Sequence, residues 1–198
     1  MKKPFRRYGV VSLGLRIATV ALAVAAGMGT GGFAQAGEGK SMPVIVDKTL
    51  VAWVRLADTA QRGGSALTLD DMGTRFDGIV FGEIAPGKWM AGSDGFQRTS
   101  KHQDADPAEM AGPETAVQIA IVYEGHKVSV FRNGEPYAHH IIGSAQTFGP
   151  GSVAVMGLRH LVSTDRACLA GAIEDARIFA ARLTVEQIAA LRPHEASE

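Results

Sequence analysis

Aromatic and polar side chains lie close together in the segment from residue 89 to residue 98. Aromatic ring faces stack on sugar rings, and carboxylate and guanidinium groups make directional hydrogen bonds to hydroxyl groups. This combination favours carbohydrate recognition. The alternative is that the two aromatic residues anchor the core and that Arg98 is a surface residue. The candidate ligand contacts are Trp89, Ser93, Asp94, Phe96 and Arg98, joined by Arg159 and His160 from the end of a later strand.

Three acidic residues in the polar stretch 92–113 would suit a hard cation. Asp104, Asp106 and Glu109 offer the carboxylate oxygens that calcium prefers in proteins. Calcium is therefore the cofactor that the sequence suggests, with these three side chains as its ligands. The alternative is a solvated acidic loop, because the stretch shows no complete ligand pattern.

No predicted strand carries a pair of carboxylates at the spacing that glycoside hydrolysis needs. Asp77 and Glu83 point to the same face of a predicted strand 76–84, but six steps of about 3.3 Å separate them by roughly 20 Å. The two carboxyl groups of a glycosidase lie about 5 to 9.5 Å apart. We therefore predict no catalytic residue, although a pair formed between two strands stays open.

Two other motifs match only in part. Residues 82–88 have the glycine and lysine spacing of a phosphate-binding loop, but Trp89 stands where a Ser or Thr would hold magnesium. We interpret this segment as a turn. The six histidines show no metal-ligand spacing, and His139 and His140 are adjacent.

The N-terminal residues 1–36 have the features of an export signal. A basic start precedes an apolar stretch from about Ile17 to Met28, and Ala34-Gln35-Ala36 has the small-residue pattern of a cleavage site. We predict cleavage after Ala36 and a periplasmic or secreted protein. The export route, general or twin-arginine, stays open, and an uncleaved membrane anchor is the alternative.

Removal of the leader changes the charge of the chain. The full sequence has 20 basic and 20 acidic residues, and the leader contains five basic residues and no acidic one. The mature chain therefore has 15 basic and 20 acidic residues, a net charge of −5. Because a nucleic-acid-binding protein needs a basic patch, we exclude nucleic acid as a partner, and an anionic membrane would attract this chain little.

The remaining length suits one domain with a single core. We divide it into a short N-terminal segment 37–47, a domain 48–193 and a tail 194–198. Cys168 is the only cysteine, so the chain forms no internal disulfide. We expect it to be a small buried apolar residue.

Short runs of alternating apolar and polar residues recur along the chain, whereas helical periodicity is nearly absent. This pattern predicts an all-β, two-sheet antiparallel jelly-roll sandwich. The clearest hairpin pairs 117–124 with 127–132, and Asn133-Gly134 then turns into a third strand. The other predicted elements are strands at 49–56, 66–69, 76–84, 152–156 and 172–179, a loop or two short edge strands at 92–113, and one helix at 184–191 capped by Thr184 and Gln187.

Two segments resemble parts of a known family. Residues 117–134 resemble the central hairpin of laminin-G-like, concanavalin A-like domains, where a strand with a Tyr, a tight turn and a strand ending in Asn-Gly recur. Residues 171–188 look like the terminal strand and helix of that family. The resemblance covers about residues 48–191, and the stretches 76–83, 89–93 and 157–160 are similar to copies found in large secreted bacterial proteins.

The resemblance implies a jelly roll that binds glycans or proteins. Family members usually begin with a further strand near the terminal one, for which only 37–47 is available, so we expect a thin edge or one completed by another chain. The leading hypothesis is a secreted, non-catalytic module that binds a carbohydrate or an extracellular or periplasmic protein. The alternatives are a polysaccharide hydrolase or lyase on the same scaffold, and a structural docking subunit of a larger exported complex.

Overall fold

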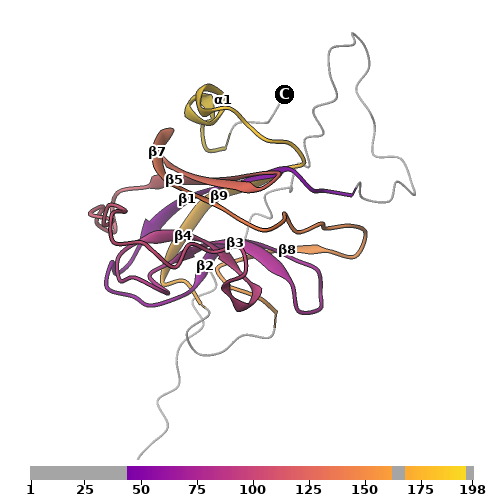
Figure 1. The fold of residues 1–198 in the computed structure, drawn as a ribbon. Helices are drawn as coiled ribbons and strands as arrows, with labels where there is room; N and C mark the ends of the chain where they lie inside the picture. The colour runs from indigo at the N-terminus through magenta and orange to yellow at the C-terminus, as the bar shows by residue number, and fades with distance from the viewer. Residues whose placement is uncertain (1–43, 162–167, 195–198) are drawn as a thin grey trace, which may run out of the picture.

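The computed structural model describes residues 44–161 and 168–194. In this part of the chain two antiparallel sheets pack face to face, and a short helix lies on the outer side of one of them (Figure 1). The predicted all-β, two-sheet antiparallel sandwich is confirmed. The predicted leader 1–36 and most of the predicted segment 37–47 lie outside the described residues.

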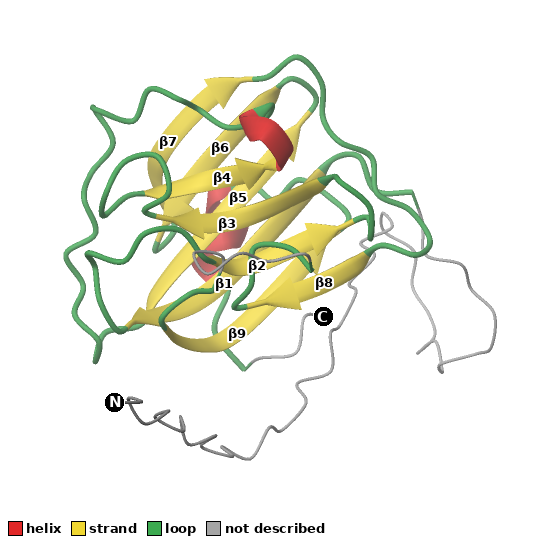
Figure 2. Ribbon diagram, turned by 90° about the horizontal axis from the view of Figure 1, so that it is seen from below, coloured by secondary structure: helices red, strands yellow, loops and turns green. Residues whose placement is uncertain are grey.

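The larger sheet has five strands in the order β7-β6-β5-β1-β9, and the smaller has four in the order β4-β3-β2-β8. Figure 2 shows the smaller sheet in front of the larger one. The strands of the larger sheet are β1 (Lys48–Leu56), β5 (Val117–Glu124), β6 (Lys127–Arg132), β7 (Glu135–Ile141) and β9 (Gly171–Phe179). Those of the smaller sheet are β2 (Ser65–Asp70), β3 (Phe76–Phe81), β4 (Trp89–Ser93) and β8 (Val153–Met156).

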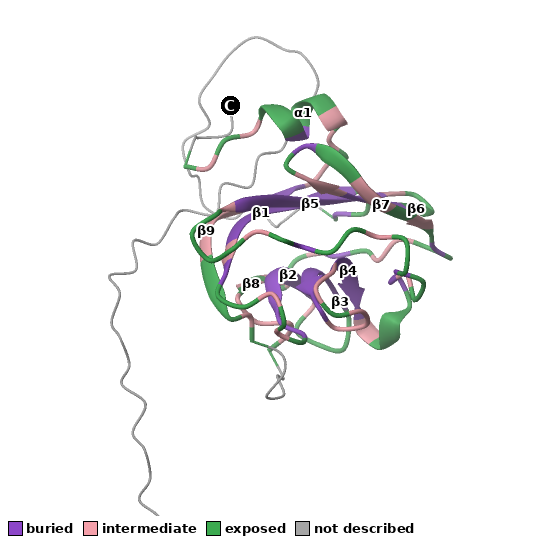
Figure 3. Cartoon of the chain, turned by 90° about the vertical axis from the view of Figure 1, so that its left-hand side faces the viewer, coloured by how far each residue is buried: buried purple, intermediate pink, exposed green. Residues whose placement is uncertain are grey.

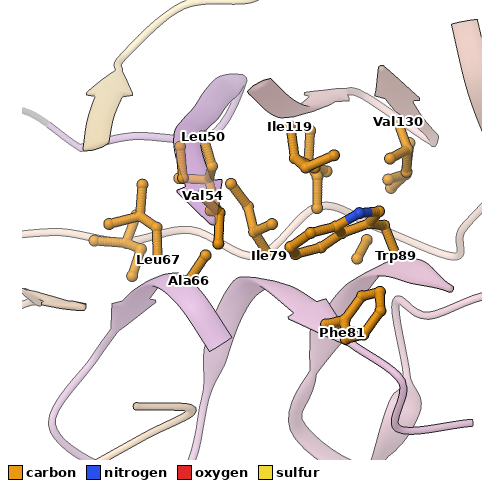
Figure 4. Packing of buried hydrophobic residues seen from close by; sticks show 14 of the residues in the cluster. Leu50, Val54, Ala66, Leu67, Ile79, Phe81, Trp89, Ile119 and Val130 are labelled. Atoms are coloured by element: carbon orange, nitrogen blue, oxygen red, sulfur yellow. The ribbon is translucent and has the colours of Figure 1, made fainter. Parts of the chain in front are cut away.

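The core lies between the two sheets, where alternate residues of each strand face inward. Leu50 and Val54 of β1 and Ile119 of β5 point from the larger sheet towards Ile79 and Trp89 of the smaller one (Figure 4). The other face of β1 carries Val51 and Trp53, which belong to a second, smaller apolar cluster. The strand is therefore buried on both faces.

Helix α1 (Val185–Ala190) covers that second cluster on the outer side of the larger sheet, where Figure 3 shows it above β5 and β7. Ile188 is its buried residue. The predicted capping box is confirmed, because the Thr184 side chain accepts from the Gln187 backbone N–H and the Gln187 side chain accepts from the Thr184 N–H. No helix in the described residues has the length and apolarity to cross a membrane.

The meander β5-β6-β7 forms as predicted, and its turns use left-handed backbone. Gly125 has φ of 54°, and Asn133 and Gly134 have φ of 52° and 79°. Asn and Gly adopt these values at low cost, which is why they favour tight hairpin turns.

The structure differs from the predicted strands by more than one residue at two places. The strand predicted over 76–84 ends at Phe81, because Gly82 turns with φ of 69° and its N–H bonds to the Lys88 carbonyl oxygen. Residues 82–88 thus form the turn expected of them. An edge strand, β4, runs from Trp89 to Ser93, three residues before the polar stretch was expected to start, and the loop 97–116 follows it.

The N-terminal edge is thin in the described residues. Ile45 forms an isolated antiparallel bridge with Phe148, and β9 has β1 as its partner in the sheet order. Cys168 is exposed, contrary to our expectation. Its backbone forms an isolated antiparallel β-bridge with Leu158 at the surface, so its side chain does not enter the core.

Candidate ligand pocket

A cavity of about 480 Å³ opens at the end of the smaller sheet where β2 ends, β3 begins and β4 ends. Residues from the turn after β2, from the 3-10 turn Asp94–Phe96 and from the segment after β8 complete its wall. Five of the seven predicted contact residues line it. The lining residues are Asp70, Gly73, Thr74, Phe76, Glu83, Ser93, Asp94, Gly95, Phe96, Arg159 and His160.

Aromatic rings form part of the pocket wall. The rings of Phe76 and His160 are stacked, with centroids 5.6 Å apart and an angle of 29° between their planes. Phe96 is 36% exposed and is held at the pocket by a left-handed backbone, with φ of 57°. Phe76 was not among the predicted contacts, although its position as the first residue of β3 opposite Asp70 of β2 places it at this sheet end.

Asp94 is held in place by Arg98, which lies behind the pocket wall. Arg98 Nη2 lies 2.5 Å from Asp94 Oδ1 and donates to the Phe76 carbonyl oxygen, and the Arg98 N–H donates to Ser93 Oγ. Arg98 is buried, so it is neither the surface residue nor the direct ligand contact that the sequence suggested. It instead fixes three residues that do line the pocket.

The Arg98 guanidinium also enters a buried ionic network between the sheets. Its Nε lies 2.8 Å from Asp77 Oδ1, and Lys48 Nζ lies 3.0 Å from Asp77 Oδ2, with Lys48 and Asp77 fully buried. Burial disfavours the charged guanidinium, but the charges of and hydrogen bonds to Asp77 and Asp94 outweigh it and raise the pKa of Arg98. For Lys48 burial wins, and its pKa lies below the ordinary value.

The other charged residues of the pocket are also engaged. Arg159 forms an ion pair with Glu83, and burial lowers the pKa of the Arg159 guanidinium. Asp70 accepts the backbone N–H of Met72 at 2.7 Å and that of Leu161 at 3.4 Å. The two predicted contacts after β8, Arg159 and His160, thus join Asp94 and Phe96 in one pocket.

Trp89 lies in the core rather than in the pocket. Its ring is fully buried against Phe81, with centroids 4.7 Å apart, and its Nε1 donates to Glu109 Oε2 at 2.9 Å. A stacking platform needs an accessible ring face, so this placement removes Trp89 from the ligand contacts and agrees with its alternative role as a core anchor.

Glu109 anchors the loop 97–116 between the two sheets. Arg132 Nη2 and Nε donate to its two carboxylate oxygens at 2.7 and 2.8 Å, and the Ala111 N–H donates to Oε1 at 2.8 Å. Burial acts to raise the pKa of Glu109, but the hydrogen bonds from Arg132, Ala111 and Trp89 outweigh it and hold the pKa below its ordinary value.

The predicted calcium ligands do not come together. Glu109 is buried and occupied by Arg132, while Asp104 is exposed in the loop. Burial raises the pKa of Asp106. Within 44–161 and 168–194, no group of three or more His, Cys, Asp or Glu residues is placed to hold a metal ion.

A second hollow, of about 380 Å³, lies between α1 and the outer face of the larger sheet. None of the predicted contact residues is among those lining it. Its lining residues are Trp53, Ala116, Gln118, Asn133, Glu174, Ala189, Leu191, Arg192 and Pro193.

The two-sheet sandwich and its connections define a lectin-type β-sandwich. The chain belongs to the concanavalin A-like lectin/glucanases superfamily, because a family model of that description (Laminin_G_3) matches residues 28–189. This confirms the resemblance found in the sequence. The matched range begins within the predicted leader, so the boundary at Ala36 stays a prediction. A comparison with curated proteins gives no match.

Solved structures share the fold at low sequence identity. Domain 4 of AbnA, an extracellular GH43 arabinanase from Geobacillus stearothermophilus solved with arabinotriose, matches with a TM-score of 0.54 and 14% identity over 75% of this chain and 69% of that chain. A putative carbohydrate-binding protein from Bacteroides ovatus matches with a TM-score of 0.55 and 15% identity, over 75% of this chain and 42% of that chain. The heptameric SAP-like pentraxin of Limulus polyphemus matches with a TM-score of 0.50 and 11% identity, over 76% of this chain and 71% of that chain. At these identities the likeness shows the fold alone.

Proposed function

We propose that the protein is an exported, non-catalytic module that binds a carbohydrate in the pocket at the end of the smaller sheet. The observation that carries the proposal is the stacked pair Phe76–His160 in one cavity with the carboxylate of Asp94 and the guanidinium of Arg159. The accessible rings at this pocket are those of His160, stacked on the buried Phe76, and of Phe96; they would take the apolar side of a sugar, and the charged groups its hydroxyls.

The size and rigidity of the pocket support this function. A cavity of about 480 Å³ lies within the range of small-ligand sites, which are concave and largely preformed. Asp94 is fixed by Arg98, and Arg159 is fixed by Glu83. Since these side chains are already ordered, ligand binding would pay less conformational entropy to immobilise them.

The engagement of the carboxylates argues for binding rather than catalysis. A general acid or base must exchange a proton with the substrate, which requires a carboxyl group free to do so. Glu83 is paired with Arg159, Asp94 is paired with Arg98 through Oδ1 alone, and the oxygens of Asp70 accept backbone N–H groups. The solved relatives include a domain bound to arabinotriose and a putative carbohydrate-binding protein, which agrees with a binding role.

A glycan-array screen of the purified protein, with and without calcium, tests the proposal. We expect calcium-independent binding of at least one glycan and no cleavage of it by mass spectrometry. His160→Ala removes one ring of the stacked pair and should weaken binding at least tenfold, while His139→Ala, at an exposed position of β7, should leave it unchanged. Binding that survives His160→Ala would place the ligand elsewhere, cleavage would make the protein an enzyme, and silence on every glycan would favour a protein partner.

A further inference from the structure

We infer that the carbohydrate bound in this pocket carries a protonated amine, so that the ligand is an amino sugar rather than a neutral or acidic one. The inference rests on the proposed function and names the substrate class of the same pocket. Charge, one carboxylate oxygen and the aromatic wall each point to a cation.

The charge count in and behind the pocket is negative. Asp70, Glu83 and Asp94 line it, whereas Arg159 is the cationic side chain among the lining residues. The ion pairs behind Asp94 add Arg98, Asp77 and Lys48. Four carboxylates thus face three cationic groups, which leaves one negative charge uncompensated when His160 is neutral.

The Asp94 carboxylate is the negatively charged group that a ligand cation would contact. Its Oδ1 accepts from Arg98 Nη2 at 2.5 Å and from the Phe76 N–H at 3.4 Å. Its Oδ2 accepts no hydrogen bond from residues 44–161 or 168–194, and the side chain is 17% exposed at the pocket. An ammonium group donates to such an oxygen with a charge-assisted hydrogen bond.

The aromatic wall adds a second attraction for a cation. Phe76 and Phe96 line the same pocket as Asp94, and Phe96 belongs to the same 3-10 turn as that carboxylate. A cation near an aromatic face is attracted by the ring quadrupole, and this attraction grows when water is displaced. A protonated amine on a sugar ring would meet both the rings and the carboxylate.

An acidic sugar would meet the opposite conditions. Its carboxylate would have to pair with Arg159, which is already bound to Glu83 and has only 17% of its side chain exposed. It would also approach three carboxylates in the wall. Like charges at such separations cost free energy, so the pocket discriminates against anionic sugars.

A matched pair of ligands tests the inference directly. Calorimetry at pH 7.0 and low salt compares a glucosamine trimer with its fully N-acetylated form, which has the same rings and no charge. We expect the amine form to bind about tenfold more tightly, as one charge pair near a protein surface gives, and its advantage to shrink in 0.5 M salt. Asp94→Asn retains an oxygen for Arg98 and should reduce the ratio to about one, whereas Glu135→Gln, at an exposed position of β7, should preserve it.

Phe96→Leu is the second variant, because it removes the ring face at an exposed position and leaves the ion pairs of Arg98, Asp77, Lys48 and Arg159 unchanged in composition. It should weaken the amine form severalfold. Equal or tighter binding of the N-acetylated form overturns the inference and leaves the proposed function intact. If neither trimer binds but another glycan binds on the array, the inference is again overturned and the proposed function again stays intact. Failure of every glycan overturns both.

Discussion

Arg98 Nη2 lies 2.5 Å from Asp94 Oδ1, so a residue of the pocket wall is joined to the ionic network between the sheets. The same guanidinium donates from Nε to Asp77 Oδ1 at 2.8 Å. Asp77 belongs to β3 of the smaller sheet and pairs with Lys48 of β1 in the larger one. The pocket is therefore tied to a contact that crosses the core.

Arg98→Met should destabilise the fold and abolish binding together. It leaves Asp77 and Asp94 without the guanidinium, and removing one partner of a buried ion pair costs about 3 to 5 kcal/mol. Urea denaturation with global fitting measures the loss in the free energy of unfolding.

Arg98→Lys is the matched control. One ammonium group keeps the charge but cannot reproduce the two-pronged contact with Asp77 and Asp94, so we expect a smaller loss of stability and a clear loss of affinity. A free energy of unfolding for Arg98→Met within about 1 kcal/mol of the wild type would show that the network contributes little.

Part of this network was readable in the sequence. Alternation along the predicted strand placed Asp77 on the same face as Ile79 and Phe81, and that face proves to be the core. The side chain of a buried Asp demands cationic partners. Neither partner was identified, since Lys48 lies one residue before the predicted strand 49–56 and Arg98 enters from a loop that periodicity does not describe.

Glu109→Gln should lower stability at neutral pH and flatten its dependence on acid. The pKa of Glu109 is depressed in the folded protein, so its carboxylate contributes stability above its ordinary pKa of 4.5, and this contribution is lost as the pH falls through the folded pKa. We expect a cost of about 1 to 3 kcal/mol near pH 7, because the hydrogen bonds from Arg132 and Trp89 lose their charged acceptor.

Thermal unfolding between pH 3 and pH 7 measures this effect. The melting temperatures of the wild type and Glu109→Gln should approach each other as the pH falls from about 4.5 through the lower pKa of the folded wild-type carboxylate. A constant gap over the whole range would assign the loss to the changed shape of the side chain rather than to its charge.

Gly134→Ala should cost more than Gly125→Ala, because the two glycines share a backbone conformation but not a neighbourhood. Both have left-handed φ, of 79° and 54°. A Cβ on Gly134 would lie 2.7 Å from the Cβ of Ala189 in α1, whereas one on Gly125 would meet nothing within 4 Å. Left-handed backbone costs Ala about 1 to 2 kcal/mol at either site, and the clash adds about 1 to 3 at Gly134.

Chemical denaturation of the two glycine variants measures the difference, and circular dichroism checks that the sandwich remains. Equal losses would mean that α1 moves away from the β6–β7 turn without cost. This prediction isolates the docking of α1, since the turn conformation is matched between the two sites.

The site was less predictable than the fold for a physical reason. Strands follow from local alternation and tight-turn residues, which the meander shows. The pocket is assembled from chain segments far apart in sequence, such as Asp94 and His160, and the register of β2 with β3 determines which residues meet there. Residue type alone made Trp89 a predicted ligand contact, but its ring is buried in the core. Phe76 was not predicted as a contact, although it lines the pocket.

Glu83→Gln should alter the ligand preference of the pocket with little effect on stability. The Glu83–Arg159 pair is partly exposed, with 19% and 17% of the side chains accessible, so losing it costs on the order of 1 kcal/mol or less. The change frees Arg159 and removes the net negative charge of the pocket. Since an amine is then less favoured, the ratio of affinities between the glucosamine trimer and its N-acetylated form should fall severalfold in calorimetry, and an anionic sugar should gain. An unchanged ratio would show that Asp94 alone sets the preference, because its ion pair with Arg98 does not involve Glu83.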